Sequence, residues 1–396
     1  MKLKPLFALL IFALSLSACI TEYHAVLSKN TRVLFVDGSI VENTEATFYI
    51  TQSFPLNVVG VPDEAFVNDA VLRIIDSNGN RSEPAVSLGR GRYQIWIGEL
   101  DANVAYGIRI EHNGEIYEST LLRPLVTPEI DSISWRQNDD ETISFHVSTT
   151  DDAGDVRFFM WNYVEDWEIR AFMPTSIFFN PRHVEQMAEP FYVDWSFPFE
   201  ACWVNHISDR FLMGSTEALS ENRLINHQLF EHGAEDNRFS VRYSVLVTQR
   251  AISQAAYEYF ENLRKQNEEM GGLFTPQPTE ILGNIRSTTN PARRVLGYVE
   301  AVKSISQKRI FVDRSELSRP TIHRFCDPLF NVYRPPPPLL RLPRPDQYFD
   351  YFNRGYRPSK INMEEYPAVV IPMEWALKEC TDCREMGGTL NRPDFW

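Results

Sequence analysis

Hydrophobic and polar residues alternate in short runs along the first third of the chain. Residues 33–36 form an apolar run that ends at Asp37-Gly38, and Phe48 and Ile50 alternate with polar neighbours. Similar runs occur at 70–75, 93–97, 105–111 and 116–117, separated by turns rich in Gly and Asn. Alternation with period two and such turns predicts short β-strands. We therefore predict an immunoglobulin-like β-sandwich over residues 32–123.

A second β-rich region follows two prolines, Pro124 and Pro128, which mark a linker because proline disrupts strand pairing. Apolar residues alternate again between 130 and 147, and the aromatic-rich segment 158–172 is predicted to be extended. Strands are also predicted at 240–248, 295–302 and 308–312. Together these runs predict a second, fibronectin-III-like domain over residues 129–332.

One helix interrupts this β pattern. Ser253 is a suitable N-cap, and apolar residues then recur at helical spacing up to Leu263. Gly271-Gly272 ends the pattern. The sequence thus predicts an inserted helix over residues 253–270.

The last segment, residues 333–396, is predicted to be an irregular tail. Its first part is rich in proline, including Pro335 to Pro338, and favours the polyproline II conformation. Such a run is either a docking motif or a stiff surface loop, and the loop is the favoured interpretation.

The N-terminus has the pattern of a bacterial lipoprotein signal. Lys2 and Lys4 precede an apolar run over residues 6–16, and Leu16-Ser17-Ala18-Cys19 is a lipobox. The run has about half the roughly 20 residues that a membrane-spanning helix needs. We predict a signal peptide over residues 1–18, lipidation of Cys19, and a polar tether over residues 19–31. The alternative is a plain signal sequence beside a free cysteine.

Composition limits the partners. The chain is acidic, with a formal net charge of −14, so nucleic acid and anionic lipid headgroups are poor partners. The predicted membrane attachment therefore comes from the lipid on Cys19. A hydrophobic content of 43% is sufficient for packed cores in more than one domain.

Four further cysteines, Cys202, Cys326, Cys380 and Cys383, fit two disulfides in an exported protein. Three pairings are possible, and one of them joins Cys380 to Cys383 locally. The C-x-x-C spacing of that pair also occurs in redox proteins, but there it lies at a helix N-terminus in an α/β fold. Structural disulfides are the favoured interpretation.

Other motifs give no specific chemistry. His227 and His232 are five residues apart, which does not match a helical zinc motif, and the Asp151–Asp155 cluster lacks the ligand alternation of an EF-hand. No nucleophile elbow or phosphate-binding loop is present in the sequence. We predict no metal and no cofactor, and a carboxylate pair formed only in the fold remains open.

Aromatic residues cluster between 158 and 203 and could form a ligand groove or a core. Our groove candidates in this segment are Trp161, Tyr163, Trp167 and Trp195.

The order of several motifs resembles a family of bacterial outer-membrane lipoproteins catalogued as domain of unknown function 4249. The resemblance extends over nearly the whole mature chain. It rests on the lipobox, on residues 34–38, 155–161, 243–245 and 253–257, on Gly283-Asn284, Gly297-Tyr298, the Cys380–Cys383 pair, Gly387-Gly388 and the last residues, Pro393 and Phe395-Trp396.

The resemblance implies an accessory protein of a TonB-dependent outer-membrane receptor, with no established catalytic residues. We therefore expect an outer-membrane lipoprotein that binds a ligand or docks on such a transporter. The alternatives are a surface hydrolase acting on glycan or peptide and a structural or assembly factor of the envelope. The ligand and the face of the membrane on which the body lies are open.

Overall fold

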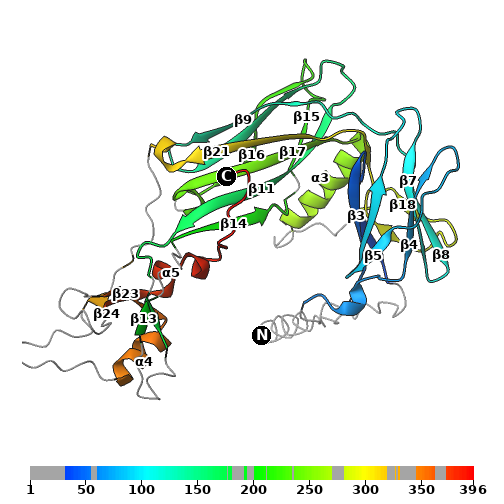
Figure 1. Cartoon of the computed structure of the whole chain (residues 1–396). Helices are drawn as coiled ribbons and strands as arrows, with labels where there is room; N and C mark the ends of the chain where they lie inside the picture. Colours follow the sequence, from blue (N-terminus) through cyan, green and yellow to red (C-terminus); the bar gives the residue numbers. More distant parts are fainter. Residues whose placement is uncertain are drawn as a thin grey trace, which may run out of the picture.

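The structure is a computed structural model that describes residues 32–54, 60–175, 177–180, 191–193, 200–210, 212–233, 236–269, 281–318, 326, 329–330, 345–361 and 372–396. The predicted signal peptide (1–18), the tether (19–31) with Cys19, Trp195 and the proline run at 335–338 lie outside these residues. The fold is mainly β, with two sandwiches and a smaller C-terminal unit (Figure 1). Within the described part, no helix is long and apolar enough to cross a membrane.

The first sandwich packs two sheets against each other, with strand orders β19-β1-β3-β6-β5 and β18-β8-β7-β4. Phe48, Tyr93, Leu72 and Ile108 are fully buried between the sheets. The strands predicted from alternation are confirmed within a residue or two, because their apolar positions are the ones that face this core. The predicted strands are β1 Leu34–Asp37, β3 Thr44–Gln52, β4 Val71–Asp76, β6 Arg92–Ile97, β7 Tyr106–His112 and β8 Glu115–Ser119. The edge strand β5 (Val86–Gly89) was not predicted.

A segment from much later in the chain completes this first sandwich. β18 (Ile285–Ser287) pairs with β8, and β19 (Val295–Leu296) pairs with β1 in parallel. β20 (Ala301–Val302) pairs with β2 (Ile40–Val41). The assignment of residues 295–302 to the second domain is therefore wrong. Alternation identifies a strand but not its partner.

Two glycines allow this returning segment to approach the sandwich closely. A Cβ at Gly283 would overlap the carbonyl oxygen of Gly297, and a Cβ at Gly297 would overlap that of Val36. We call these three residues the glycine crossing. Beside it, the Asn284 side chain donates to Val299 O (2.8 Å) and accepts from Val299 N (2.9 Å). Gly283, Asn284 and Gly297, which carry part of the sequence resemblance, therefore make contacts that stabilise the fold.

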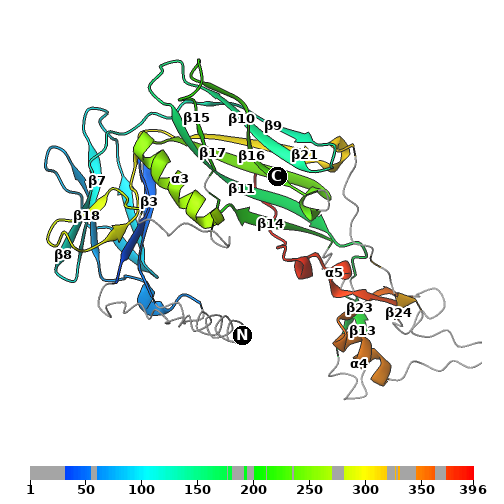
Figure 2. The same cartoon turned by 180° about the vertical axis from the view of Figure 1, so that it is seen from behind.

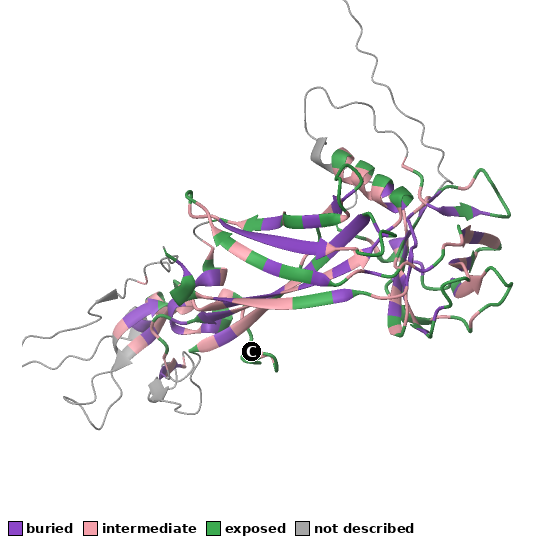
Figure 3. Ribbon diagram, turned by 90° about the horizontal axis from the view of Figure 1, so that it is seen from above, coloured by how far each residue is buried: buried purple, intermediate pink, exposed green. Residues whose placement is uncertain are grey.

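The second sandwich packs the sheet β16-β10-β9 against the sheet β14-β11-β17-β21, to which β15 adds through β11. Its core contains Phe145, Phe159, Trp161 and Tyr243. Buried and intermediate positions alternate over most of β17, whereas β10 is buried along nearly its whole length. Figure 3 shows how burial changes along the strands. The bounds are β9 Ile130–Gln137, β10 Ile143–Thr150, β11 Phe158–Arg170, β14 Ala201–Ile207, β15 Leu212–Ser215, β16 Arg223–His232, β17 Arg242–Ala251 and β21 Ser306–Asp313.

The predicted helix is α3 (Gln254–Glu269), which lies at the junction of the two sandwiches (Figure 2). Ala256 and Tyr259 pack with Phe158 and Met160 of β11 in one hydrophobic cluster. Ser253 caps the helix by accepting a hydrogen bond from Ala256 N (3.2 Å). The apolar face of α3 therefore fastens the junction.

The C-terminal unit is held by a small aromatic core of Phe179, Tyr348 and Trp375. Its elements are β12 Ile177–Phe179, β13 Phe191–Val193, β22 Leu329–Phe330, α4 Pro345–Asn353, β23 Tyr356–Ile361, β24 Pro372–Leu377 and α5 Lys378–Thr381. Short 3₁₀ turns elsewhere are Asp63–Ala65, Asn237–Phe239, Arg314–Glu316 and Cys383–Met386.

Two disulfides staple this unit. Cys202 bonds Cys383 across 181 residues, and Cys326 bonds Cys380 across 54 residues. The two cysteines of the C-x-x-C motif therefore pair with distant partners rather than with each other. This arrangement is that of structural disulfides.

Candidate ligand-binding groove

A row of polar and aromatic side chains crosses the outer face of the sheet β14-β11-β17-β21. Strand register aligns Trp203, Glu168, Arg242 and Asp313 side by side on the four strands. Because side chains alternate along a strand, the neighbouring Trp167 points to the sandwich core and Glu168 points away from it. The row is therefore a surface feature of the fold.

The row forms the floor of a cavity of about 440 Å³. Its walls include Arg170 of β11 and, from the C-terminal tail, Arg392 and Trp396. An adjoining hollow of about 680 Å³ shares Arg170 and Asp313 and adds Arg314. We call the two spaces together the arginine groove; its charged and aromatic lining residues are Glu168, Arg170, Trp203, Arg242, Asp313, Arg314, Arg392 and Trp396.

Cations exceed anions in this groove. Arg170 Nε lies 2.6 Å from Glu168 Oε1, and Arg242 Nε lies 3.3 Å from Asp313 Oδ1. Four arginine side chains thus face two side-chain carboxylates, in a chain whose net charge is −14. Arg392 Nη2 also donates to Trp396 O at 2.7 Å. A guanidinium has five N–H donors, so each of these ion pairs leaves donors for a further acceptor. The groove is suited to an anionic group.

Aromatic groups complete the groove. The Trp203 indole N–H is buried and has no hydrogen-bond partner among the described residues. The Trp396 indole N–H donates to Glu168 Oε2 at 3.3 Å, and Arg242 lies over Phe311 at 4.3 Å from the ring centroid. Besides charge, the groove offers flat aromatic rings, whereas the buried Trp203 N–H is not open to a ligand.

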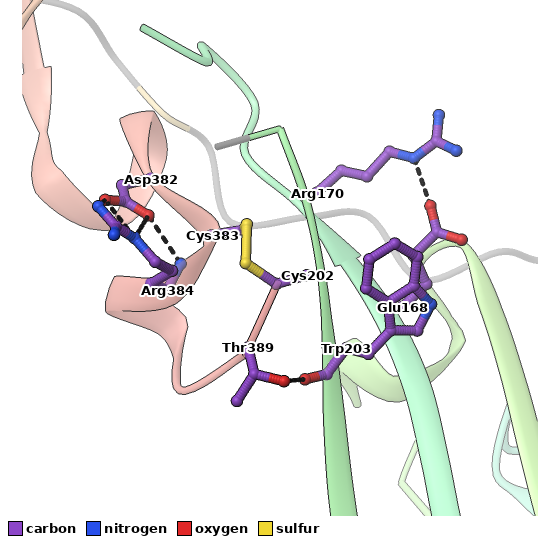
Figure 4. The surroundings of a disulfide bond; sticks show 8 residues. All are labelled: Glu168, Arg170, Cys202, Trp203, Asp382, Cys383, Arg384 and Thr389. Atoms are coloured by element: carbon purple, nitrogen blue, oxygen red, sulfur yellow. Dashed lines mark hydrogen bonds and ion pairs between the residues drawn. A yellow bond between two sulfur atoms is a disulfide. The ribbon is translucent and has the colours of Figure 1, made fainter. Parts of the chain in front are cut away.

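The Cys202–Cys383 disulfide joins β14 to the start of the C-terminal tail, close to the contact of Trp203 with Thr389 (Figure 4). Trp203, next to Cys202, exchanges two 2.8 Å backbone hydrogen bonds with Thr389. A Cβ at Gly388 would overlap the Cβ of Cys202, so the chain passes close to the disulfide there. From this fixed point the tail continues over the sheet.

A second polar cluster lies inside the second sandwich, centred on the fully buried Glu165. Tyr243 donates to Glu165 Oε1 (2.7 Å), and His232 Nε2 lies 2.6 Å from the same oxygen. His206 Nδ1 lies 3.0 Å from Oε2, and Arg238 Nη1 lies 3.5 Å from Oε1. Burial raises the pKa of Glu165, but hydrogen bonds from His232 and Tyr243 and the charge of Arg238 outweigh it and lower the pKa.

This Glu165 cluster contains a carboxylate and two imidazoles, as a proton relay does. However, no hydroxyl or thiol nucleophile of the described residues is hydrogen-bonded to either imidazole. Nor do the described residues contain three or more metal-ligating side chains grouped to hold an ion. We interpret the cluster as a buried hydrogen-bond network that stabilises the second sandwich.

The predicted aromatic groove is not found at Trp161 and Tyr163. These side chains are 1% and 4% exposed and belong to the core, because they stand on the core-facing positions of β11. Trp167 is partly buried under Arg238, whose guanidinium lies 5.0 Å from its ring centroid. Trp195 lies outside the described residues.

The other candidate motifs also have structural positions. His227 packs against Trp161, with ring centroids 5.3 Å apart. Asp151 accepts hydrogen bonds from the backbone N–H groups of Ala153 and Val156, as in a closed polar turn. The groove arginines were missed, although charged residues at alternate positions in 166–170 did indicate an outward polar face.

The chain belongs to the family described as Domain of unknown function (DUF4249), whose pattern matches residues 20–308. No curated protein matches the sequence.

Solved structures share only weak likeness with the chain. A Salmonella alpha-2-macroglobulin reacted with methylamine is 7% identical, with a TM-score of 0.17, over 57% of this chain and 14% of that one. A two-domain fibronectin type-III segment of chicken tenascin is 10% identical, with a TM-score of 0.15, over 56% and 91%. The FN1–FN3 domains of chicken CNTN1 are 12% identical, with a TM-score of 0.16, over 55% and 60%.

Proposed function

We propose that this protein is a lipid-anchored outer-membrane protein that binds an anionic ligand in the arginine groove and serves a TonB-dependent transporter. In this proposal it is a binding protein rather than an enzyme. The observation that carries the proposal is the groove itself, in which four arginines and two tryptophans surround two carboxylates.

The proposed location is supported by the N-terminal sequence and by the cysteines. The family match begins at residue 20, directly after the lipobox residue Cys19. Two disulfides between distant cysteines fit a protein that matures in an oxidising compartment. The lipobox supports attachment through a lipid on Cys19, and the disulfides support export.

The proposed ligand chemistry follows from the groove's hydrogen-bond donors. Arginine pairs with carboxylate and phosphate through parallel N–H donors, and these charge-assisted hydrogen bonds are the stronger ones. Trp203 and Trp396 can pack against the apolar part of the same ligand. An acidic sugar or an acidic peptide has both parts.

Binding can be tested with two anionic probes, an oligogalacturonide and a glutamate-rich peptide, each beside a neutral counterpart. We expect Arg170→Glu/Arg392→Glu to weaken binding of the anionic probe by at least about tenfold, because charge-assisted contacts contribute about 1.5–3 kcal/mol each. Arg157→Glu/Arg223→Glu is the matched control, since both arginines are exposed and lie outside the groove. Equal loss in both variants, or equal binding of the neutral probes, would contradict the groove.

The anchor is tested separately. Cys19→Ala should move the protein out of the outer-membrane fraction and abolish palmitate labelling. Crosslinking followed by pull-down from native membranes should recover a TonB-dependent receptor with wild type. Unchanged fractionation of Cys19→Ala would reject the lipid anchor without affecting the groove.

A further inference from the structure

The first sandwich exposes large apolar side chains on the outer face of its sheet β19-β1-β3-β6-β5. Trp96 of β6 is 65% exposed, and Val86 of the neighbouring edge strand β5 is 64% exposed. Val86 pairs with Gln94, two residues before Trp96, so these two side chains lie close together. Tyr49 and Phe35 are exposed on the same side of β3 and β1, since their sequence neighbours point to the core, but the register places Tyr49 opposite Arg92, further along the sheet. Clustered exposed apolar residues of this kind mark interaction surfaces more often than single ones do.

A shallow pocket of about 340 Å³ lies at the β5 end of this face. Trp96, Val86, Glu45 and Glu83 are among its lining residues. Glu45 stands directly opposite Trp96 in the β3–β6 register. The pocket thus combines an indole ring with two carboxylates.

Within the described part of the chain, these two carboxylates lack a cationic partner. No ion pair joins Glu45 or Glu83 to a lysine, arginine or histidine of the described residues. In the arginine groove, by contrast, both carboxylates are paired. An indole face beside two unpaired carboxylates is complementary to a lysine or arginine side chain.

The position of this face in the chain also limits what can reach it. The described part begins at Arg32, in the first sandwich. Twelve residues separate Cys19 from Arg32, and a fully extended segment of that length spans at most roughly 40 Å. If Cys19 carries the anchor, as the proposed function states, the first sandwich stays close to the membrane.

We propose that this face, defined by Trp96, Val86, Glu45 and Glu83, is the docking surface for a membrane-embedded protein. The partner supplies an extended segment with a basic side chain, which lies over Trp96 between the two carboxylates, and an apolar residue against Val86. The docking surface and the arginine groove lie on different sandwiches, so partner and ligand do not compete for one site. This inference rests on the proposed lipid anchor and adds the place and chemistry of the contact.

Photo-crosslinking in whole cells tests the occupant. A photoreactive residue replaces Gln94, which lies in the pocket beside Trp96, and a control replaces the exposed Ile225 on the second sandwich. We expect position 94, but not 225, to crosslink to an integral membrane protein through a segment containing Lys or Arg. Trp96→Ala should lower this yield about tenfold, as expected for a central aromatic contact, and Glu45→Lys/Glu83→Lys should do the same. Glu231→Lys is the charge control.

Other outcomes would overturn the proposal. A crosslink to a second copy of the chain, to lipid, or to no protein rejects the docking surface, and so does a yield that the Trp96 and Glu45/Glu83 variants leave unchanged. Membrane fractionation of the same wild-type cells reports the anchor independently. A protein that leaves the membrane fraction contradicts the proposed function, whereas an anchored protein without the crosslink contradicts only the docking surface.

Discussion

Each of the two sandwiches is stabilised by a different kind of internal contact. The first is closed by close backbone approach at the glycine crossing, and its outer face exposes apolar side chains. The second contains the buried Glu165 cluster, and a disulfide fixes the tail to its charged outer face. Gly283 and Gly297, which carry part of the family resemblance, thus stabilise the first sandwich. The charged groove lies on the second sandwich.

The largest effect is expected at the glycine crossing. Gly283→Ala should destabilise the first sandwich by more than about 4 kcal/mol, because the new Cβ meets backbone that cannot move aside cheaply. Gly98→Ala is the matched control, since a Cβ at Gly98 meets no atom within 4 Å. Denaturant unfolding combined with hydrogen exchange measures both. Similar stabilities for the two variants would show that the crossing tolerates a side chain.

A smaller effect is expected from the disulfide beside the groove. Cys202→Ser/Cys383→Ser should destabilise the tail and its contacts with β14 by about 3 kcal/mol, because the bond closes a long loop. Proteolysis after reduction should cut the C-terminal part first. The strands of the first sandwich contain no cysteine, so their exchange rates should not change on reduction. Equal loss of hydrogen-exchange protection in both sandwiches on reduction would contradict this difference between them.

The smallest effects concern two buried carboxylates with opposite pKa shifts. Partners lower the pKa of Glu165, so its stabilisation is present above the unfolded value of about 4.3 and is lost as the pH falls below it. Burial raises the pKa of Glu300, against hydrogen bonds from Ser253, so its charge costs stability above that same value.

Substitution by glutamine separates the two cases. At pH 7, Glu165→Gln should destabilise by about 2 kcal/mol, through lost hydrogen bonds to charged groups. Glu300→Gln should be neutral or stabilising at pH 7. Unfolding curves between pH 7 and pH 3.5 should show both differences from wild type shrinking as the pH falls. Two variants that shift stability in the same direction at pH 7 would contradict this prediction.

Local sequence predicted elements better than it predicted their neighbours. Alternation located β1, β3, β9 and β10, and a cap with helical spacing located α3. It could not show that residues 295–302 pair with the first sandwich, because pairing depends on the whole fold. The sequence alone left two interpretations of the aromatic cluster, a ligand groove or a hydrophobic core. Trp161 stands on a core-facing position of β11, so it belongs to the core.

The arginine groove lay beyond sequence analysis for a related reason. Glu168, Arg242 and Asp313 come from three strands far apart in the chain, and only strand order and register make them neighbours. A tail residue, Trp396, then closes the side. No local spacing encodes such a site.

The returning segment has a consequence for the order of folding. The Ile116 N–H donates to the Thr289 side-chain oxygen, 173 residues later in the chain. β1 likewise pairs with β19, which begins at Val295. The first sandwich therefore cannot close until most of the chain has been synthesised, and contacts so distant in sequence form slowly. During synthesis, its early strands need protection from aggregation until their partners have been made. The N-terminal sandwich is thus the first part of the body to be made and among the last to be completed.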